Sequence, residues 1–194
     1  MRTPASARAE AIETPRLRLR RFTEADLPAF VAYRNDPEVA RYQSWDGCTP
    51  DEAGAFLAEQ DGLRPGTPGA WFQFAVEVKS TGALAGDCAL HVHDEDPRLG
   101  AIGYTLAREA QGRGYATEAV RALLAYAFGT LGLHRVSATT DCENAASVAL
   151  LERVGMRREA HFIQHVWFKG RWSDEYVYAL LRDEWAARAP APPA

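Results

Sequence analysis

The sequence contains few cysteines and no long apolar segment. Its cysteines are Cys48, Cys88 and Cys142, three among 194 residues, and none of them forms a Cys-x-x-Cys pair. This usage excludes a disulfide-rich scaffold and is typical of reduced thiols in a cytoplasmic protein. Arg121 interrupts the longest apolar candidate, which falls short of the ~18 residues that a membrane span requires. The N-terminus also lacks the apolar core of a signal peptide, so we expect a cytoplasmic protein that does not associate with a membrane.

An excess of basic residues is also absent. The net charge is -4 at pH 7, which gives no general attraction to nucleic acid. Residues 16–21 are a local exception, in which basic residues alternate with Leu17 and Leu19. This alternation favours an edge strand with both leucines turned inward over a nucleic-acid-binding patch.

The composition, with 47% hydrophobic and 25% charged residues, is typical of one globular domain. We place this domain at residues 14–186, between flexible segments at 1–13 and 187–194 that lack a periodic apolar pattern. Strand and helix patterns alternate inside the domain, which predicts an α/β fold. The expected elements are a strand at 16–21, helices starting near 23 and 49, strands at 71–78, 83–93 and 101–106, a helix from 116 that stops near Gly129 or Gly132, a strand at 135–140, a helix at 145–153, and two strands around a turn at 169–170.

A glycine-containing loop joins the strand expected at 101–106 to the amphipathic helix that starts at Ala116. Gly112 and Gly114 lie at the start of this helix, where the first backbone amides have no intrahelical acceptor. Glycine lets the backbone approach a bulky anion closely, and the helix dipole adds ~0.3 to 1 kcal/mol for a negative group. The loop therefore indicates a pyrophosphate-binding site.

Two better-known phosphate loops do not fit these residues. A dinucleotide-binding fingerprint requires glycine or alanine at position 117, which is Thr117. A P-loop requires lysine and then serine or threonine after the last glycine, where this chain has Tyr115. Taken alone, the loop is either an anion cradle or a plain turn between a strand and a helix.

Three ordered motifs resemble those of the GCN5-related N-acetyltransferase (GNAT) superfamily. Residues 111–116 are similar to its Gln/Arg-x-x-Gly-x-Gly/Ala motif, which binds the pyrophosphate of acetyl-CoA. Residues 144–147 and 153–156 resemble the Asn-x-x-Ser and Gly-Phe elements of the ribosomal-protein alanine/serine N-acetyltransferase branch, and 167–176 resembles the closing hairpin of that branch. The resemblance spans roughly residues 14–186. It implies the GNAT fold, with a mixed, mostly antiparallel sheet, splayed central strands and flanking helices, and it is compatible with a homodimer.

The resemblance implies that acetyl-CoA binds along the middle of the chain. Tyr104 and Leu106 match the strand whose backbone holds the pantetheine and the thioester. The implied cofactor-binding residues are Tyr104, Leu106, Gln111, Gly112, Arg113, Gly114, Tyr115, Ala116, Thr117 and Asn144. Asn144 and Ser147 match residues near the thiol, so the implied catalytic role of Ser147 is to donate a proton to the leaving thiolate. Asn144 also suits an ordinary helix N-cap, and both roles are compatible.

The general base departs from the pattern of the branch. Its members often carry Glu immediately before the Ile-Gly-Tyr run, where this chain has Ala101. Candidates elsewhere are Glu77, Asp87, His91 and His93, and a water relay is an equal alternative. An α-amine of pKa near 8 needs only about 1.4 kcal/mol to be neutral at pH 7, whereas a lysine-like amine needs about 4.6 kcal/mol. The missing Glu therefore favours an α-amine or another amine of low pKa.

We therefore expect transfer of an acetyl group from acetyl-CoA to a primary amine through a tetrahedral intermediate. The acceptor is expected to be the α-amine of a peptide or protein N-terminus or a small-molecule amine. The residue at position 101 also leaves open a CoA-binding sensor or interaction protein with impaired catalysis. Trp45 lies in a polar loop where no periodic pattern explains its burial, so we predict that it contacts the acceptor. His91 and His93 could ligate a metal with the acidic residues 94–96, but a solvated turn is the more common arrangement, so we predict no metal.

Overall fold

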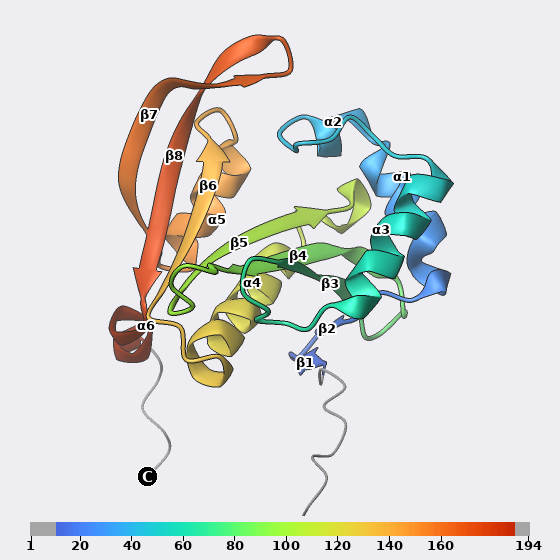
Figure 1. The fold of residues 1–194 in the computed structure, drawn as a ribbon. Coiled ribbons are helices and arrows are strands. Elements are labelled where there is room, and N and C mark those ends of the chain that lie inside the picture. The colour runs from blue at the N-terminus through green and yellow to red at the C-terminus, as the bar shows by residue number, and fades with distance from the viewer. Residues whose placement is uncertain (1–10, 189–194) are drawn as a thin grey trace, which may run out of the picture.

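A mixed sheet of eight strands organises the chain, in the order β1-β2-β3-β4-β5-β6-β8-β7 (Figure 1). The structure is a computed structural model that describes residues 11–188. The strands are β1 (Ile12–Glu13), β2 (Leu17–Arg20), β3 (Trp71–Val78), β4 (Leu84–Val92), β5 (Leu99–Leu106), β6 (Arg135–Asp141), β7 (Arg157–Phe168) and β8 (Arg171–Leu181). Neighbouring strands are antiparallel except for β5 and β6, which are parallel. The predicted mixed, mostly antiparallel sheet is confirmed.

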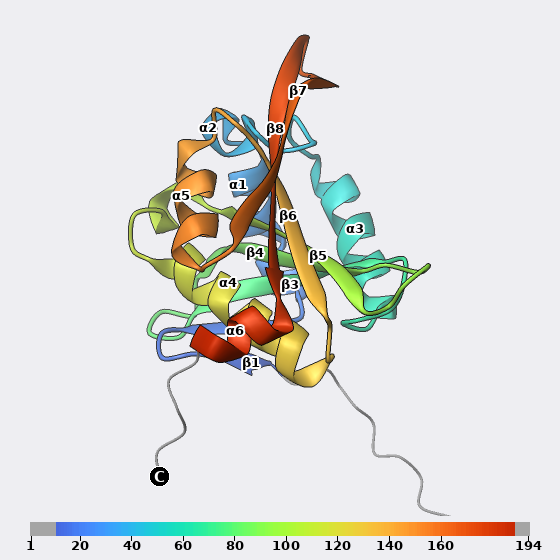
Figure 2. The ribbon, with the colours of Figure 1, turned by 90° about the vertical axis from the view of Figure 1, so that its left-hand side faces the viewer.

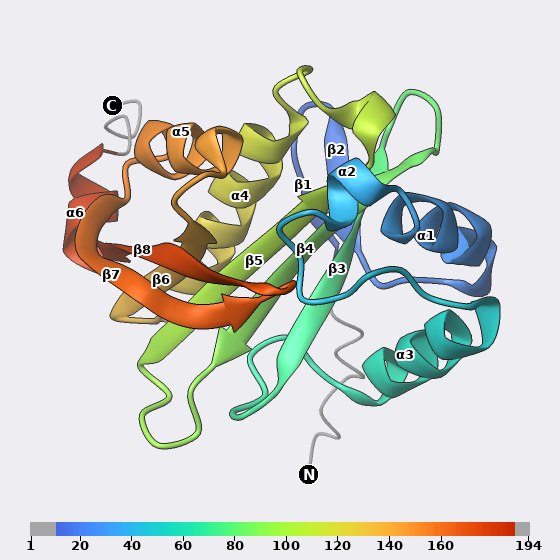
Figure 3. The ribbon, with the colours of Figure 1, turned by 90° about the horizontal axis from the view of Figure 1, so that it is seen from above.

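Helices cover both faces of this sheet. Their bounds are η1 (Glu24–Asp26), α1 (Leu27–Arg34), α2 (Pro37–Ala40), α3 (Pro50–Gly62), η2 (Arg108–Ala110), α4 (Tyr115–Ala125), the π-helical turn η3 (Tyr126–Thr130), α5 (Ala145–Arg153) and α6 (Arg182–Arg188). Helices α4 and α5 lie on one face of the sheet and α1 and α3 on the other, as Figures 2 and 3 show. Each face of the central strands is therefore buried, and the apolar stripe of α4 supplies Ala119, Val120, Leu123 and Leu124 to the core.

The two parallel strands separate along their length. Strands β5 and β6 pair only through Leu99–Ala101 and Arg135–Ser137, after which β6 provides no partner for Ile102–Leu106. The predicted splay of the central strands is therefore confirmed. It opens a space in the middle of the sheet where backbone amides and side chains from both strands can reach a ligand.

The ends of the domain differ from the prediction. Leu17 and Leu19 are fully buried as expected, but β2 is not the edge strand, because Ile12 and Glu13 form β1 beside it. The flexible segments predicted at 1–13 and 187–194 lie mostly outside the described residues, yet β1 and the last turn of α6 are ordered. A two-residue strand and an exposed terminal helix are too short or too polar to leave a periodic apolar signal.

Helix α2, which the sequence did not reveal, is a single turn between α1 and α3. Asp36 caps it by accepting a hydrogen bond from the backbone N–H of Glu38 at 2.9 Å, and Pro37 occupies the first helical position. Asp followed by Pro is a helix-start signal that could have located it. The turn contains too few residues for helical periodicity, but it lines two of the cavities described below.

A buried carboxyl group joins α1 to the sheet. Asp87 on β4 is almost completely buried, and its Oδ2 accepts a hydrogen bond from the Tyr33 hydroxyl at 2.5 Å. Burial raises the pKa of Asp87 to about 6, although the hydrogen bond from Tyr33 opposes the rise. The carboxyl therefore gains its charge inside the protein only at a higher pH than in the unfolded chain.

This shift predicts how the Asp87→Asn variant responds to pH. Because the folded state holds this proton more tightly, the contribution of Asp87 to stability is present below pH 3.8 and is lost as the pH rises through 6. An amide does not ionise and can still accept from Tyr33. The unfolding free energy of Asp87→Asn minus that of the wild type should therefore rise by on the order of 2 kcal/mol between pH 4 and pH 7. Urea denaturation at both pH values measures it, and parallel pH curves would contradict the shift.

Candidate active site

A cavity of about 660 Å³ lies where β5 ends and α4 begins. It is bounded by α2, β5, the loop before α4 and one face of α5. The lining residues are Glu38, Val39, Tyr42, Gln43, Tyr104, Thr105, Leu106, Ala110, Gln111, Gly112, Gly114, Tyr115, Ala116, Thr117, Asn144, Ala146, Ser147, Ala149, Leu150 and Arg153. We call this space the donor cavity. Every residue that the sequence analysis placed in the cofactor site lines it, except Arg113. Arg113 instead turns its carbonyl to the Arg16 guanidinium, whose Nη1 donates to it at 2.9 Å.

The glycine loop has the backbone that an anion cradle requires. Gly112 and Gly114 adopt positive φ angles of 72° and 77°, in the left-handed region that favours glycine. Gly114 is the N-cap of α4 and lines the donor cavity, and the first amides of this helix have no intrahelical acceptor. The Gln111 amide group donates to the carbonyl of Leu106 at 3.0 Å and thereby ties the loop to the end of β5.

Two further groups support the cradle and were not found from the sequence. Glu118 on α4 accepts hydrogen bonds from the Thr14 hydroxyl at 2.6 Å and the Arg16 backbone amide at 2.8 Å, which anchors α4 to the segment between β1 and β2. Arg153 lines the cavity and supplies a cation there, with Nη1 3.4 Å from the Thr117 hydroxyl. The spacing of Ala146, Ala149 and Arg153 on α5 puts them on one helical face, a signal that could have placed Arg153 beside the loop.

A hydrogen-bonded pair of hydroxyl groups lies at the inner end of the donor cavity. Tyr104 Oη and Ser147 Oγ are 2.7 Å apart, although the residues are 43 positions apart in the chain. Burial raises the pKa of Tyr104 to about 12, so its phenol stays protonated at neutral pH. Asn144 accepts from the backbone N–H of Ser147 at 3.1 Å and is thus a helix N-cap, as the simpler of its two predicted roles requires.

A second, smaller cavity of about 220 Å³ continues from this pair into the space between the splayed strands. It shares Tyr42, Gln43, Tyr104, Asn144 and Ser147 with the donor cavity. Its other walls come from β5, β6 and the β7–β8 hairpin, and are formed by Ile102, Gly103, Ala138, Thr139, Thr140, Asp141, Val166, Phe168, Ser173 and Glu175. The hydroxyl pair therefore lies at the junction of two cavities, which allows a group held in one to meet a group held in the other.

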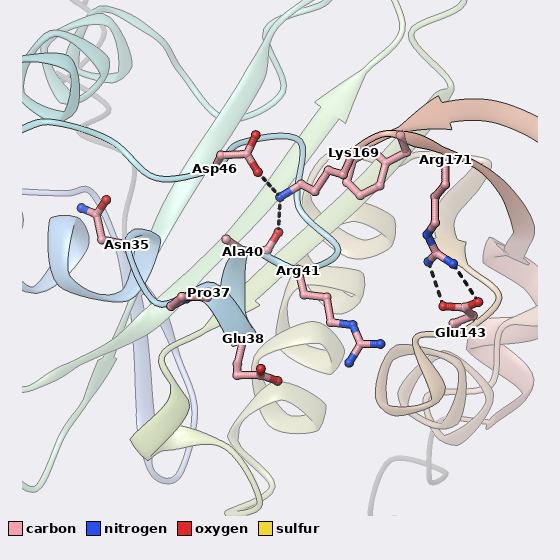
Figure 4. A pocket seen from close by; sticks show the side chains of 10 residues that line it. Asn35, Pro37, Glu38, Ala40, Arg41, Asp46, Glu143, Lys169 and Arg171 are labelled. Atoms are coloured by element: carbon pink, nitrogen blue, oxygen red, sulfur yellow. Dashed lines mark hydrogen bonds and ion pairs between the residues drawn. The ribbon is translucent and has the colours of Figure 1, made fainter.

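An outer cavity of about 550 Å³ lies between α2 and the tip of the hairpin (Figure 4). Lys169, in the turn joining β7 to β8, crosses it and donates to the carbonyls of Ala40 at 2.7 Å and Trp45 at 2.8 Å. Its Nζ also lies 2.7 Å from Asp46 Oδ1. These contacts hold the hairpin against α2. The predicted turn at 169–170 is confirmed, with positive φ at both positions.

The structure does not bring Trp45 to the cleft. Its ring packs under the Arg34 guanidinium at 4.1 Å, and it lines none of the three cavities described above. The ring is half-buried beside a partner that the sequence analysis did not identify. The partner is a cation from α1 that lies eleven positions earlier, which no local pattern reveals.

The base candidates proposed from the sequence also lie away from the hydroxyl pair. Glu77 Oε2 accepts a hydrogen bond from Arg20 Nε at 2.5 Å, and Asp87 accepts the hydrogen bond from Tyr33 that is described above. His91 packs against His93 and Trp71 toward the far end of β4. None of these four candidates lines a cavity described here. Neither His91 nor His93 belongs to a group of three side chains within residues 11–188 that could hold a metal ion.

Comparisons with known proteins match both the sequence and the fold. Residues 16–157 match the family model described as an acetyltransferase (GNAT) domain. The uncharacterized N-acetyltransferase p20 of Bacillus licheniformis is 32% identical over 178 residues, covering 91% of this chain and 99% of the relative. The uS5-alanine N-acetyltransferase of Escherichia coli is 31% identical over 84 residues, 43% of each chain.

Two solved structures share the arrangement of elements. A GNAT-family acetyltransferase from Bacillus anthracis is 31% identical, covers 90% of this chain and 100% of its own, and has a TM-score of 0.81. The spermidine N-acetyltransferase of Vibrio cholerae, solved in complex with CoA and spermine, has a TM-score of 0.78 at 24% identity, over 89% of this chain and 99% of its own. At 24% identity, the match to the spermidine N-acetyltransferase shows a shared fold and nothing more. Within residues 11–188, no helix combines the length and apolarity needed to cross a membrane.

Proposed function

The chain belongs to the acetyltransferase (GNAT) family and is an N-acetyltransferase that uses acetyl-CoA, and we propose that its acceptor is the α-amine of a peptide or protein N-terminus or a small-molecule amine. One observation carries the proposal. The donor cavity and the smaller cavity meet at the hydrogen-bonded hydroxyls of Tyr104 and Ser147. A thioester in one cavity and an amine in the other would come together at that junction.

The donor is proposed to lie with its pyrophosphate on the amides after Gly112 and Gly114. The α4 dipole and the Arg153 guanidinium favour the negative charge there, and the small side chains of Ala146 and Ala149 leave room for the rest of the molecule. The pantetheine would follow the end of β5 toward Tyr104. Because β6 has separated from β5 there, backbone groups of β5 are free to bind the pantetheine amides and the thioester oxygen.

The reaction we propose is direct attack. The amine nitrogen forms a bond to the thioester carbon, and the resulting tetrahedral intermediate collapses with cleavage of the carbon–sulfur bond. Ser147 donates its hydroxyl proton to the departing thiolate, and Tyr104, at 2.7 Å, passes its own proton to Ser147. The proton that the nitrogen loses as the amide forms restores the Tyr104 hydroxyl. Neutralising the thiolate in this way prevents its return to the carbonyl carbon.

Thiol release from acetyl-CoA tests this function directly. Purified protein is assayed with short peptides bearing free N-termini, with aliphatic polyamines and with aminoglycosides, and N-terminally blocked peptides serve as controls. Release with one class of amine identifies the acceptor. Binding of acetyl-CoA without release across the panel would instead support a CoA-binding sensor.

The proposal also includes the compartment and the oligomeric state of the enzyme. Cys48, Cys88 and Cys142 are all unpaired, which is usual in a reducing compartment such as the cytoplasm. The homodimer that is compatible with the family resemblance can be read from sedimentation of the purified protein.

A further inference from the structure

The small cavity between the splayed strands has an anionic lining. Two carboxylates, Asp141 on β6 and Glu175 on β8, contribute to its walls, and no lysine, arginine or histidine among residues 11–188 does so. Asp141 and Glu175 are register partners across the β6–β8 pair, so the two negative groups lie side by side. Such a cavity favours a cation over a neutral or anionic group.

Two polar atoms of this cavity have unused hydrogen-bonding capacity. Asp141 Oδ2 and Ser173 Oγ are buried and have no hydrogen-bond partner within the described part of the chain. The Asp141 side chain is only 11% exposed, and its nearest cation, Arg171 Nη2, is 3.6 Å from Oδ2. Buried polar atoms are nearly always paired, so unpaired atoms in a cavity indicate a ligand that supplies donors. A primary ammonium group offers three N–H donors on one small atom.

Glu175 differs from most other carboxylates around the cleft in having no strong cationic partner. Glu143 is held by both guanidinium nitrogens of Arg171, at 2.9 and 2.8 Å. The charged and titratable groups that face Glu175 are Asp141 on β6 and His165 on β7, whose Nε2 lies 3.7 Å from Oε2. Its side chain is 25% exposed, so a proton that it accepts can reach solvent.

We propose that this cavity binds the acceptor as a primary alkylammonium ion and that Glu175 removes its proton before attack. The inference deepens the proposed function and rests on it. Asp141 and Ser173 hold the nitrogen, one N–H proton passes to the Glu175 carboxylate, and the freed lone pair forms the bond to the thioester carbon. The thiolate leaves with a proton from Ser147. A second N–H proton leaves the nitrogen as the amide forms and restores the Ser147–Tyr104 hydroxyl pair, and Glu175 returns its own proton to water. Glu175 on β8 thus acts as the general base. Position 101, where the branch often carries Glu, has Ala101 and cannot do so.

The surroundings of the cavity suit a slender cationic acceptor. Its volume equals that of about seven water molecules at roughly 30 Å³ each, enough for an amine and a short alkyl stem. Phe168 lines both this cavity and the outer one, where the rest of the acceptor would lie. At that mouth Lys169 and Arg171 are paired with Asp46 and Glu143, as Figure 4 shows, and Arg41 is the third cation of the lining.

The test compares Glu175→Gln with the wild type on primary amines of stepped pKa, from a peptide α-amine near 8 to an alkylamine near 10.4, between pH 7 and 9.5. Glu95→Gln, which removes the same charge from an exposed loop, is the matched control. At pH 7 we expect kcat/KM of Glu175→Gln to fall by about 100-fold for the alkylamine and by much less for the α-amine, because the α-amine is already partly neutral. The loss should shrink as the pH rises, and calorimetry should show unchanged acetyl-CoA affinity.

Further results separate the possible failures. Asp141→Asn should raise KM for the alkylamine more than it lowers kcat, and formate added to Glu175→Ala should restore part of its turnover. A loss in Glu175→Gln that is the same for every amine and every pH, or no loss at all, would overturn the role of Glu175. Silence of the wild-type protein with all amines would instead overturn the proposed function.

Discussion

Replacing Ser147 by alanine is expected to lower the turnover number of acetyl transfer by about 100-fold, while acetyl-CoA binds with unchanged affinity. The hydroxyl lies at the junction of the donor cavity and the smaller cavity, where the thiolate would form, and its side chain is hydrogen-bonded to Tyr104. Alanine also retains the start of α5, because Asn144 caps that helix by accepting from the backbone N–H of residue 147. Steady-state kinetics and calorimetry with acetyl-CoA measure the two quantities separately.

Tyr104→Phe distinguishes a relay from two independent donors. If Tyr104 supplies the proton that Ser147 gives up, each single variant interrupts the same path, and the double variant should be little slower than the slower single one. Losses that multiply would show that the two hydroxyls act separately. A turnover number that is unchanged in Ser147→Ala would remove this residue from the mechanism.

Gly114→Trp is expected to weaken acetyl-CoA binding by at least about 100-fold, which corresponds to ~2.7 kcal/mol. Gly114 lines the donor cavity at the N-terminus of α4, so an indole there would occupy the space proposed for the pyrophosphate. The φ angle of 77° also strains any side chain, which makes a control for strain necessary.

Gly114→Ala provides that control. A Cβ at this position would meet only the Arg16 guanidinium, at 3.4 Å, so alanine adds the backbone strain without filling the cradle. We expect Gly114→Ala to lose stability by ~1 kcal/mol and to retain most of its acetyl-CoA affinity. Calorimetric titration of both variants, after thermal unfolding has shown that they fold, gives the comparison. Equal affinities for the wild type and the tryptophan variant would refute the cradle.

The donor side could be predicted from the sequence because its signals are local. A strand, two glycines and an amphipathic helix follow one another between residues 101 and 131, and each step has a periodic or steric signature. The cap at Asn144 and the start of α5 are local in the same sense. The structure therefore confirmed these elements with shifts of a few residues at their ends.

The acceptor side could not be predicted in this way, because it depends on contacts between distant segments. Tyr104 meets Ser147 across 43 positions, and Asp141 meets Glu175 only through the register of β6 and β8. Glu175 sits in a strand whose burial does not alternate regularly, so nothing in the local pattern separates it from a surface carboxylate. The ring of Trp45 was assigned to the acceptor for its unusual place in a loop, and its partner proved to be Arg34.

The order of these segments along the chain has an evolutionary consequence. The groups proposed to hold acetyl-CoA end at Arg153, inside the 16–157 match to the family model. The hairpin formed by β7 and β8 begins where that match ends, and it carries Ser173 and Glu175, two of the three groups proposed to bind or deprotonate the amine. Substitutions in one short C-terminal segment can thus redirect such an enzyme to a new amine while the machinery for its common acetyl donor is inherited unchanged.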